Sequence, residues 1–352
     1  MKVSLNWIKE FVDLPADLSI QQLAYDLTMR TVEVEGFEDL GASLDKIVVA
    51  KIESVEPHPQ ADRLRVVKVD AGEDELCQVV CGGSNLEVGQ MVVLAKPGSY
   101  VRWHGEGEPV EIKASKLRGV PSAGMICASA EIGMEELFPA KEEAEIVDLA
   151  GYDATPGQPV SKLVGRDDII FEIDNKSITN RPDLWGHYGI ARELAAIYDL
   201  PLKPLPEFKE QLPAGISVEI KDDSRCARYA ALSIEGIVNK PSPIWMRERL
   251  ASLDVRPINL MVDITNYVML CVGEPTHAFD AAHVEGGIVV RRAETGEKLT
   301  LLNDEVVELC DSDLLIADKV KALALAGVMG GKLDSVLDDT QAVILEVANF
   351  DA

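Results

Sequence analysis

Hydrophobic residues recur at helical spacing in the first part of the chain. The first stripe contains Leu5, Ile8, Phe11 and Val12. A second stripe follows Ser19, and a serine followed by glutamine three residues later is a capping box. The pattern predicts two short helices within residues 1–36, followed by a half-exposed strand where apolar and acidic residues alternate at 32–37.

Between residues 39 and 150 the pattern changes to short β-branched runs separated by turn-forming residues. The runs are Ile47–Ile52, Leu64–Val69, Gln78–Cys81 and Met91–Ala95. Strands at such close spacing favour a small closed or nearly closed β-barrel. We therefore expect one barrel domain at 39–150.

Helical and strand patterns mix again after residue 150. Ile169–Ile173 reads as a strand, and Asn180–Asp183 opens a helix with proline in its first turn. His187 lies on the apolar stripe of that helix, so we interpret it as a core or edge histidine rather than a ligand. A proline-rich linker follows at 200–206.

Strands alternate with one clear helix, near Ile244–Ser252, in the last part of the chain. The predicted strands are Ala227–Ile237, Gly287–Arg291, Leu314–Ala317 and Ala342–Val347. This order indicates an α+β domain. The whole chain is thus predicted to be an α+β multidomain protein.

Composition narrows the class of protein. The 352 residues are 47% hydrophobic and 27% charged, as in soluble globular proteins. No apolar run is long enough for a bilayer span and the start lacks a signal peptide, so we expect a cytoplasmic protein without membrane contact. The six cysteines are too sparse for a disulfide framework and lack the paired spacing of a zinc site, so no metal site is predicted.

Two residues of the last domain are candidates for chemistry. Glu346 is a carboxylate inside the apolar run Val343–Ala348, where an unpaired charge is costly. It either faces outward at a sheet edge or serves a ligand. His277 follows Glu274–Thr276, which reads as a loop, and is either an acid/base or positioning group or a structural histidine bonded to Asp280.

Two further sets of residues have a structural and a functional interpretation. Thr265 and Asn266 either form a turn or cap before Tyr267 or position water or substrate. Gly327, Gly330 and Gly331 permit positive φ and close backbone approach. They form either a tight turn or a pocket wall that offers backbone N–H groups.

Several segments carry a family resemblance in their order and spacing. They are His58–Leu64, Val80–Asn85, Lys116–Cys127, Thr179–Leu184, Gly189–Glu193, Arg256–Asn259, Val262–Val268, Glu274–Asp280, Ala326–Gly331 and Leu345–Ala348. The barrel segments alone are also similar to free-standing tRNA-binding proteins and methionyl-tRNA synthetase tails. Taken together, the segments resemble the N-terminal part of bacterial phenylalanyl-tRNA synthetase β subunits from end to end.

The resemblance implies a domain plan and an activity. The plan is a split N-terminal α/β domain at 1–38 and 151–200, an inserted OB-fold tRNA-binding-type domain at 39–150, and a B3/B4-type editing domain at 207–352 that continues beyond this sequence. The implied activity is hydrolysis of tyrosine mischarged onto tRNA(Phe), within a ligase that attaches phenylalanine to tRNA. A pocket for a benzyl group rejects an added hydroxyl poorly, by about a hundredfold in the valine/threonine case, which makes a second, hydrolytic site necessary.

The resemblance also implies roles for individual residues. Glu346 matches the position that binds the tyrosyl hydroxyl. His277, Thr265 and Asn266 match the catalytic pocket that orients water and substrate, and Gly327 and Gly330 its wall. No Ser-His-Asp or Cys-His set has supporting context, so water attacks directly rather than through a covalent intermediate.

Partners and cofactors follow from the same resemblance. The implied partners are the α subunit, in a heterotetramer of two α and two β chains, and tRNA(Phe). ATP and Mg²⁺ belong to the complete enzyme, and no cofactor is expected in this part. The alternative is a non-catalytic tRNA-binding or subunit-docking module without an active editing site.

The net charge of −26 bears on tRNA binding. Phosphate contacts normally require a basic face, and the barrel region is itself acidic. Basic residues that could still gather on one face of the barrel are Arg63, Arg65, Lys113, Lys116 and Arg118. We predict tRNA contact through these five, against the alternative that the barrel docks onto the rest of the enzyme.

Overall fold

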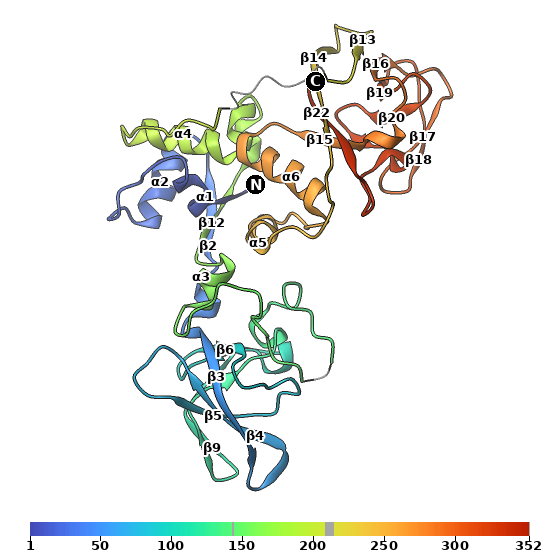
Figure 1. The fold of residues 1–352 in the computed structure, drawn as a ribbon. Coiled ribbons are helices and arrows are strands. Elements are labelled where there is room, and N and C mark those ends of the chain that lie inside the picture. The colour runs from blue at the N-terminus through green and yellow to red at the C-terminus, as the bar shows by residue number, and fades with distance from the viewer. Residues whose placement is uncertain (143, 208–214, 352) are drawn as a thin grey trace. The chain divides into compact units, whose positions relative to one another are not determined.

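The computed structural model describes residues 1–142, 144–207 and 215–351 (Figure 1). It forms two compact units, one comprising Met1–Phe37 with Phe171–Ala352 and the other Glu38–Ile170. The predicted α+β multidomain class is confirmed. The predicted three-domain plan stays a prediction, and within it residue 143 of the barrel and residues 208–214 and 352 of the editing domain lie outside the described residues.

A five-stranded antiparallel sheet forms the core of the second unit. Its order is β11(Met125–Ile126), β6(Met91–Ala95), β3(Ile47–His58), β4(Ala61–Asp70) and β5(Cys77–Cys81). The two edges meet where the Ala123 N–H, just before β11, donates to the Gln78 carbonyl of β5 at 2.9 Å. Side chains such as Val67, Val79 and Leu94 are fully buried inside. The predicted β-barrel and its four strand segments are confirmed.

Short elements decorate this barrel. They are β7(Tyr100–Val101), β8(Val110–Glu111), β9(Ser115–Leu117), β10(Val120–Ser122) and the helix α3(Val160–Val164). β9 and β10 form a hairpin with Arg118 and Gly119 at its tip, both at positive φ (45° and 87°). The hairpin rests on the β3–β4 turn, since His58 Nε2 lies 3.1 Å from the Leu117 carbonyl oxygen.

The N-terminal elements of the first unit follow the predicted pattern. They are β1(Lys2–Ser4), α1(Leu5–Lys9), α2(Ile20–Arg30), β2(Val34–Asp39), β12(Ile169–Ile173) and α4(His187–Ile197), with β12 between β1 and β2. Ser19 caps α2 by accepting the Gln22 N–H.

His187 is a core residue, as predicted. Its Nε2 accepts the Ser4 N–H at 2.9 Å, its Nδ1 lies 2.6 Å from the Leu270 carbonyl oxygen, and its ring stacks on Trp7. These two partners require a neutral ring protonated at Nδ1. Burial correspondingly lowers the pKa of His187 to about 4.

Two sheets face each other in the remainder of the first unit. One has the order β13(Val218–Ile220), β16(Ile288–Arg292), β19(Leu314–Ala317), β20(Ala322–Leu325), β21(Met329–Gly330), and the other β14(Cys226–Glu235), β22(Ala342–Phe350), β15(Thr276–Asp280). Buried side chains of both sheets form one cluster, including Phe279, Val290 and Ile344. A separate ribbon pairs β17(Lys298–Thr300) with β18(Val306–Glu308). The four predicted strands of this region are confirmed.

Two local predictions in this region were wrong. Besides the expected helix α5(Ile244–Ala251) there is a second one, α6(Leu260–Val272). It is rich in β-branched residues, which disfavour helix, but Asn259 caps its start and Gly273 ends it in the left-handed region. His277 lies in the strand β15 and not in a loop, because pairing with β22 supplies the backbone hydrogen bonds that a loop would lack.

Candidate active site

Strand register brings the two predicted pocket residues together. β15 pairs antiparallel with β22, and His277 lies directly opposite Glu346. On the other side of β22, Ala231 of β14 is opposite Glu346 and Tyr229 is opposite Ala348. Residues opposite one another, and every second residue along each strand, share one face of a sheet. His277, Glu346 and Tyr229 therefore project toward the facing sheet.

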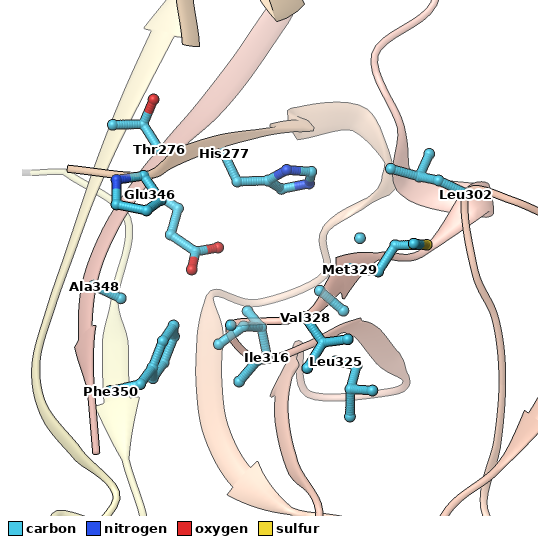
Figure 2. Close-up of a pocket in the computed structure, with 15 residues that line it drawn as sticks. Thr276, His277, Leu302, Ile316, Leu325, Val328, Met329, Glu346, Ala348 and Phe350 are labelled. Atoms are coloured by element: carbon cyan, nitrogen blue, oxygen red, sulfur yellow. The ribbon is translucent and has the colours of Figure 1, made fainter. Parts of the chain in front are cut away.

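A cavity of about 400 Å³ opens between the two sheets at this position. Figure 2 shows the His277 ring and the Glu346 carboxylate projecting into it from neighbouring strands. The remaining side chains of its wall are mostly apolar: Leu302, Ile316, Leu325, Val328, Met329, Ala348 and Phe350. The arrangement offers an apolar slot for a ring-sized group with two polar groups on one wall.

Burial sets the charge of both polar groups. Glu346 is 8% exposed, and its desolvation raises its pKa to about 7, while the nearby Tyr229 hydroxyl counteracts that rise. Desolvation lowers the pKa of His277. Near neutral pH the imidazole is thus uncharged and able to accept a proton, whereas Glu346 is close to its midpoint.

The glycines both turn the chain and shape the cavity. Gly327 and Gly330 line it, in the β20–β21 hairpin whose tight turn is closed by the Val328 N–H to the Leu325 carbonyl. Gly327 has a φ of 69°. A Cβ at Gly330 would lie 2.8 Å from His277 Cε1, so the missing side chain makes room for the imidazole. These glycines thus form the turn and two of them line the cavity, while their part in offering backbone N–H groups to a substrate stays a prediction.

Thr265 and Asn266 do not line the cavity. Both lie inside α6, and the Thr265 hydroxyl donates to the Val262 carbonyl of the same helix at 2.7 Å. Met261 of α6 packs on Ala278 and Val343, which alternate with His277 and Glu346 and so face the other side of the sheet. Thr265 and Asn266 are therefore not part of the cavity wall described above. Their role in positioning water or substrate stays a prediction.

The five basic residues of the barrel are only partly gathered. Arg118 Nη1 donates to the Gln60 carbonyl at 3.3 Å, which places it at the β3–β4 turn, close in sequence to Arg63 and Arg65 on β4. Lys116 is exposed on β9 of the same hairpin. Lys113 instead pairs with Glu111 of β8 at 3.0 Å.

Tyr229 shares the sheet face of His277 and Glu346, and the sequence pattern did not single it out. The sequence did contain an indication, because Tyr229, an aromatic residue with a hydroxyl group, lies in the strand predicted at 227–237. What could not be read was its pairing with β22, since the two strands are more than a hundred residues apart in the chain.

Two family models match the chain. A tRNA binding domain matches residues 47–150, which contain the barrel strands. A B3/4 domain matches residues 225–352, which contain the cavity. The two matches therefore fall on the two regions described above.

Curated relatives match along essentially the whole chain. The phenylalanine–tRNA ligase β subunit of Lactiplantibacillus plantarum is 40% identical over 362 residues, covering 100% of this chain and 44% of the relative. That of Solibacter usitatus is 42% identical over 358 residues, covering 100% and 43%. The chain thus spans less than half the length of these relatives.

A solved structure, an N-terminal fragment of the phenylalanyl-tRNA synthetase β subunit from Pyrococcus horikoshii, aligns with a TM-score of 0.33. It is 20% identical and covers 53% of this chain and 57% of that one; a likeness of this size does not establish a shared fold. The sequence relatives, with both domain models in place, are decisive: the chain belongs to the phenylalanine–tRNA ligase β-subunit family.

Proposed function

We propose that the cavity between the two sheets hydrolyses the ester bond of tRNA(Phe) mischarged with tyrosine. The proposal rests on one observation: His277 and Glu346 lie opposite each other on adjacent strands, in one wall of a mostly apolar cavity. The relatives' printed name, which specifies a phenylalanine–tRNA ligase, supplies the class of substrate.

The cavity has the asymmetry that such proofreading needs. An apolar wall takes the aromatic ring of either amino acid, but only tyrosine carries a hydroxyl for Glu346. Phenylalanine would leave the buried carboxylate desolvated and unpaired, which costs about 1–3 kcal/mol or more for a charged group. Glu346 therefore selects the wrong amino acid by the feature that distinguishes it from the right one.

His277 supplies a basic group beside the bound ring. Its uncharged imidazole accepts a proton from water, which then attacks the ester carbonyl. The amino-acid carbonyl carbon takes the hydroxyl oxygen, and the tRNA ribose leaves with a proton. No step uses a metal or ATP, which we assign to the aminoacylation centre of the complete enzyme.

The remaining partners are those of a larger assembly. We infer that the complete enzyme is a cytoplasmic heterotetramer of two α and two β subunits, in which this chain forms the N-terminal part of the β subunit. The complete enzyme uses ATP and Mg²⁺ to charge tRNA. The barrel, matched by the tRNA-binding model, contributes tRNA contact. A non-catalytic docking module is the competing function.

A deacylation assay separates these functions. The chain is incubated with tyrosyl-tRNA(Phe) and, separately, phenylalanyl-tRNA(Phe), next to His277→Ala and Glu346→Gln variants. We expect hydrolysis of the tyrosyl ester only, with losses of about 100-fold in either variant. Release at the uncatalysed rate by the unmodified chain, with tRNA binding retained, would favour the docking module.

A further inference from the structure

Tyr229 has a buried hydroxyl without an assigned partner. The residue is 8% exposed, and its hydroxyl has no hydrogen-bond partner among the residues that the structure describes. An unpaired buried hydroxyl costs about 1–3 kcal/mol. A polar group held at that cost on the sheet face that carries Glu346 calls for a function.

The surroundings of Tyr229 leave one acceptor. Strand pairing places it on the same face as Glu346, one step along β22. The groups that titrate around Glu346 are Tyr229 and Cys226 from β14 and His277 from β15. Across the cavity the facing sheet presents apolar side chains, Ile316 and Leu325 among them. Within the described residues, the Glu346 carboxylate is thus the side-chain acceptor that the register places beside the Tyr229 hydroxyl.

The two groups already influence each other. The Glu346 charge, after burial, is the next cause of the raised pKa of Tyr229, and the hydroxyl counteracts the rise in the pKa of Glu346. The hydroxyl does not meet hydrogen-bond geometry in this structure, so donation to Glu346 requires a rotation of one of the two side chains. A rotation of that kind is within the freedom of a glutamate that borders an open cavity.

We infer that Tyr229 is a positioning residue for Glu346: its hydroxyl donates to one carboxylate oxygen and leaves the other oxygen turned into the cavity to accept a phenolic hydroxyl. The inference rests on the proposed function for the ligand, but the contact between Tyr229 and Glu346 does not. Donation to one oxygen fixes the rotamer of the carboxylate and favours its ionised form, the stronger acceptor. Selectivity for tyrosine then depends on a residue that does not itself touch the substrate.

The test compares Tyr229→Phe with a matched control, Tyr198→Phe. Tyr198 also donates to a carboxylate, that of Asp26 at 2.8 Å, but it lies outside the two sheets that border the cavity. The first measurement is a ¹³C NMR titration of glutamate carboxyls, with the Glu346 signal assigned by its loss in Glu346→Gln. We expect the midpoint of Glu346 to rise by about one pH unit in Tyr229→Phe and to stay unchanged in Tyr198→Phe.

The second measurement is tyrosyl-tRNA(Phe) hydrolysis as a function of pH. At pH 7 a midpoint raised by one unit lowers the ionised fraction, and so the rate, about fivefold in Tyr229→Phe. The rate recovers at higher pH. In a Glu346→Gln background Tyr229→Phe should have no additional effect. Circular dichroism checks that the Phe variants keep the fold.

Each outcome decides the inference. An unmoved Glu346 midpoint in Tyr229→Phe, or an equal shift in Tyr198→Phe, overturns it. A moved midpoint with an unchanged pH–rate profile shows the contact but overturns the positioning role. If the unmodified chain hydrolyses no ester, the proposed function and with it the positioning role fail, while the NMR titration still decides whether Tyr229 donates to Glu346.

Discussion

His277 and Glu346 lie opposite one another on adjacent antiparallel strands, β15 and β22. Opposite residues in such a pair have Cβ atoms about 4.5–5.5 Å apart, so the main chain sets their separation. Neither residue depends on a loop for its position. A site built on paired strands keeps its geometry better than one built on loops.

Gly330 tests the space that His277 requires. A Cβ there would come within 2.8 Å of the imidazole, so Gly330→Ala should turn the ring away and reduce tyrosyl-tRNA(Phe) hydrolysis about tenfold or more. The ring end of the side chain can give way, so the free energy of unfolding should fall by only about 1 kcal/mol. Single-turnover hydrolysis and denaturant unfolding measure the two effects.

Gly36→Ala is the control for that variant. A Cβ at Gly36 meets no atom within 4 Å, and the residue belongs to β2. It should leave hydrolysis unchanged. Full activity of Gly330→Ala would contradict the assigned position of the His277 ring.

Glu346 should make stability depend on pH. Its pKa is raised from 4.5 to about 7 by burial, so the unfolded state loses its proton first as pH rises. The stabilisation that Glu346 gives in its protonated form is complete below about pH 4.5 and is lost as pH rises through 7. Relative to the unmodified chain, the free energy of unfolding of Glu346→Gln should be about 3 kcal/mol higher at pH 8 and almost the same near pH 4.5.

Tryptophan fluorescence can follow that effect in the first unit alone. Of the four tryptophans only Trp103 belongs to the second unit, and it is exposed, so Trp103→Phe confines the signal to the first. Urea unfolding at pH 4.5 and pH 8 in this background gives the difference. The same gain at both pH values would show that folding does not raise the pKa of Glu346.

His187 should titrate far below an ordinary histidine. Its pKa is lowered from 6.5 to about 4, so the neutral ring stabilises the fold fully above pH 6.5 and this stabilisation is lost as pH falls toward 4. The loss amounts to about 3 kcal/mol. An NMR titration of the imidazole, assigned with a His187→Gln variant, should give a midpoint near 4, and a midpoint near 6.5 would refute the buried neutral tautomer.

Arg118 and Arg63 test tRNA contact by the barrel. If each arginine neutralises one phosphate, its replacement by alanine should weaken tRNA binding severalfold. The slope of log K against log salt concentration should then become shallower by about one for each residue replaced. Lys162→Ala, an exposed lysine on α3, is the matched control. Equal affinities at 50 and 200 mM salt in all variants would leave the barrel as a docking module.

The local sequence pattern was sufficient to predict most helices and strands. The strands at 47–52 and 169–173 followed from short apolar runs, and the cap at Ser19 from the spacing of serine and glutamine. The helix at 260–272 was missed because its β-branched residues favour strand by propensity, while packing on Ala278 and Val343 holds it as helix. His277 was assigned to a loop because Pro275 precedes it, whereas pairing with β22 made it a strand.

The sequence by itself determined the family, the α+β class and the two residues, His277 and Glu346, that define the candidate site. Tertiary structure decided which groups share the sheet face that borders the cavity. Register between strands distant in the chain placed Tyr229 beside Glu346 and put α6, with Thr265 and Asn266, on the other side of the sheet. The physical reason is that alternation tells which residues share a face of one strand, but only the hydrogen-bonded pairing of strands tells which faces meet.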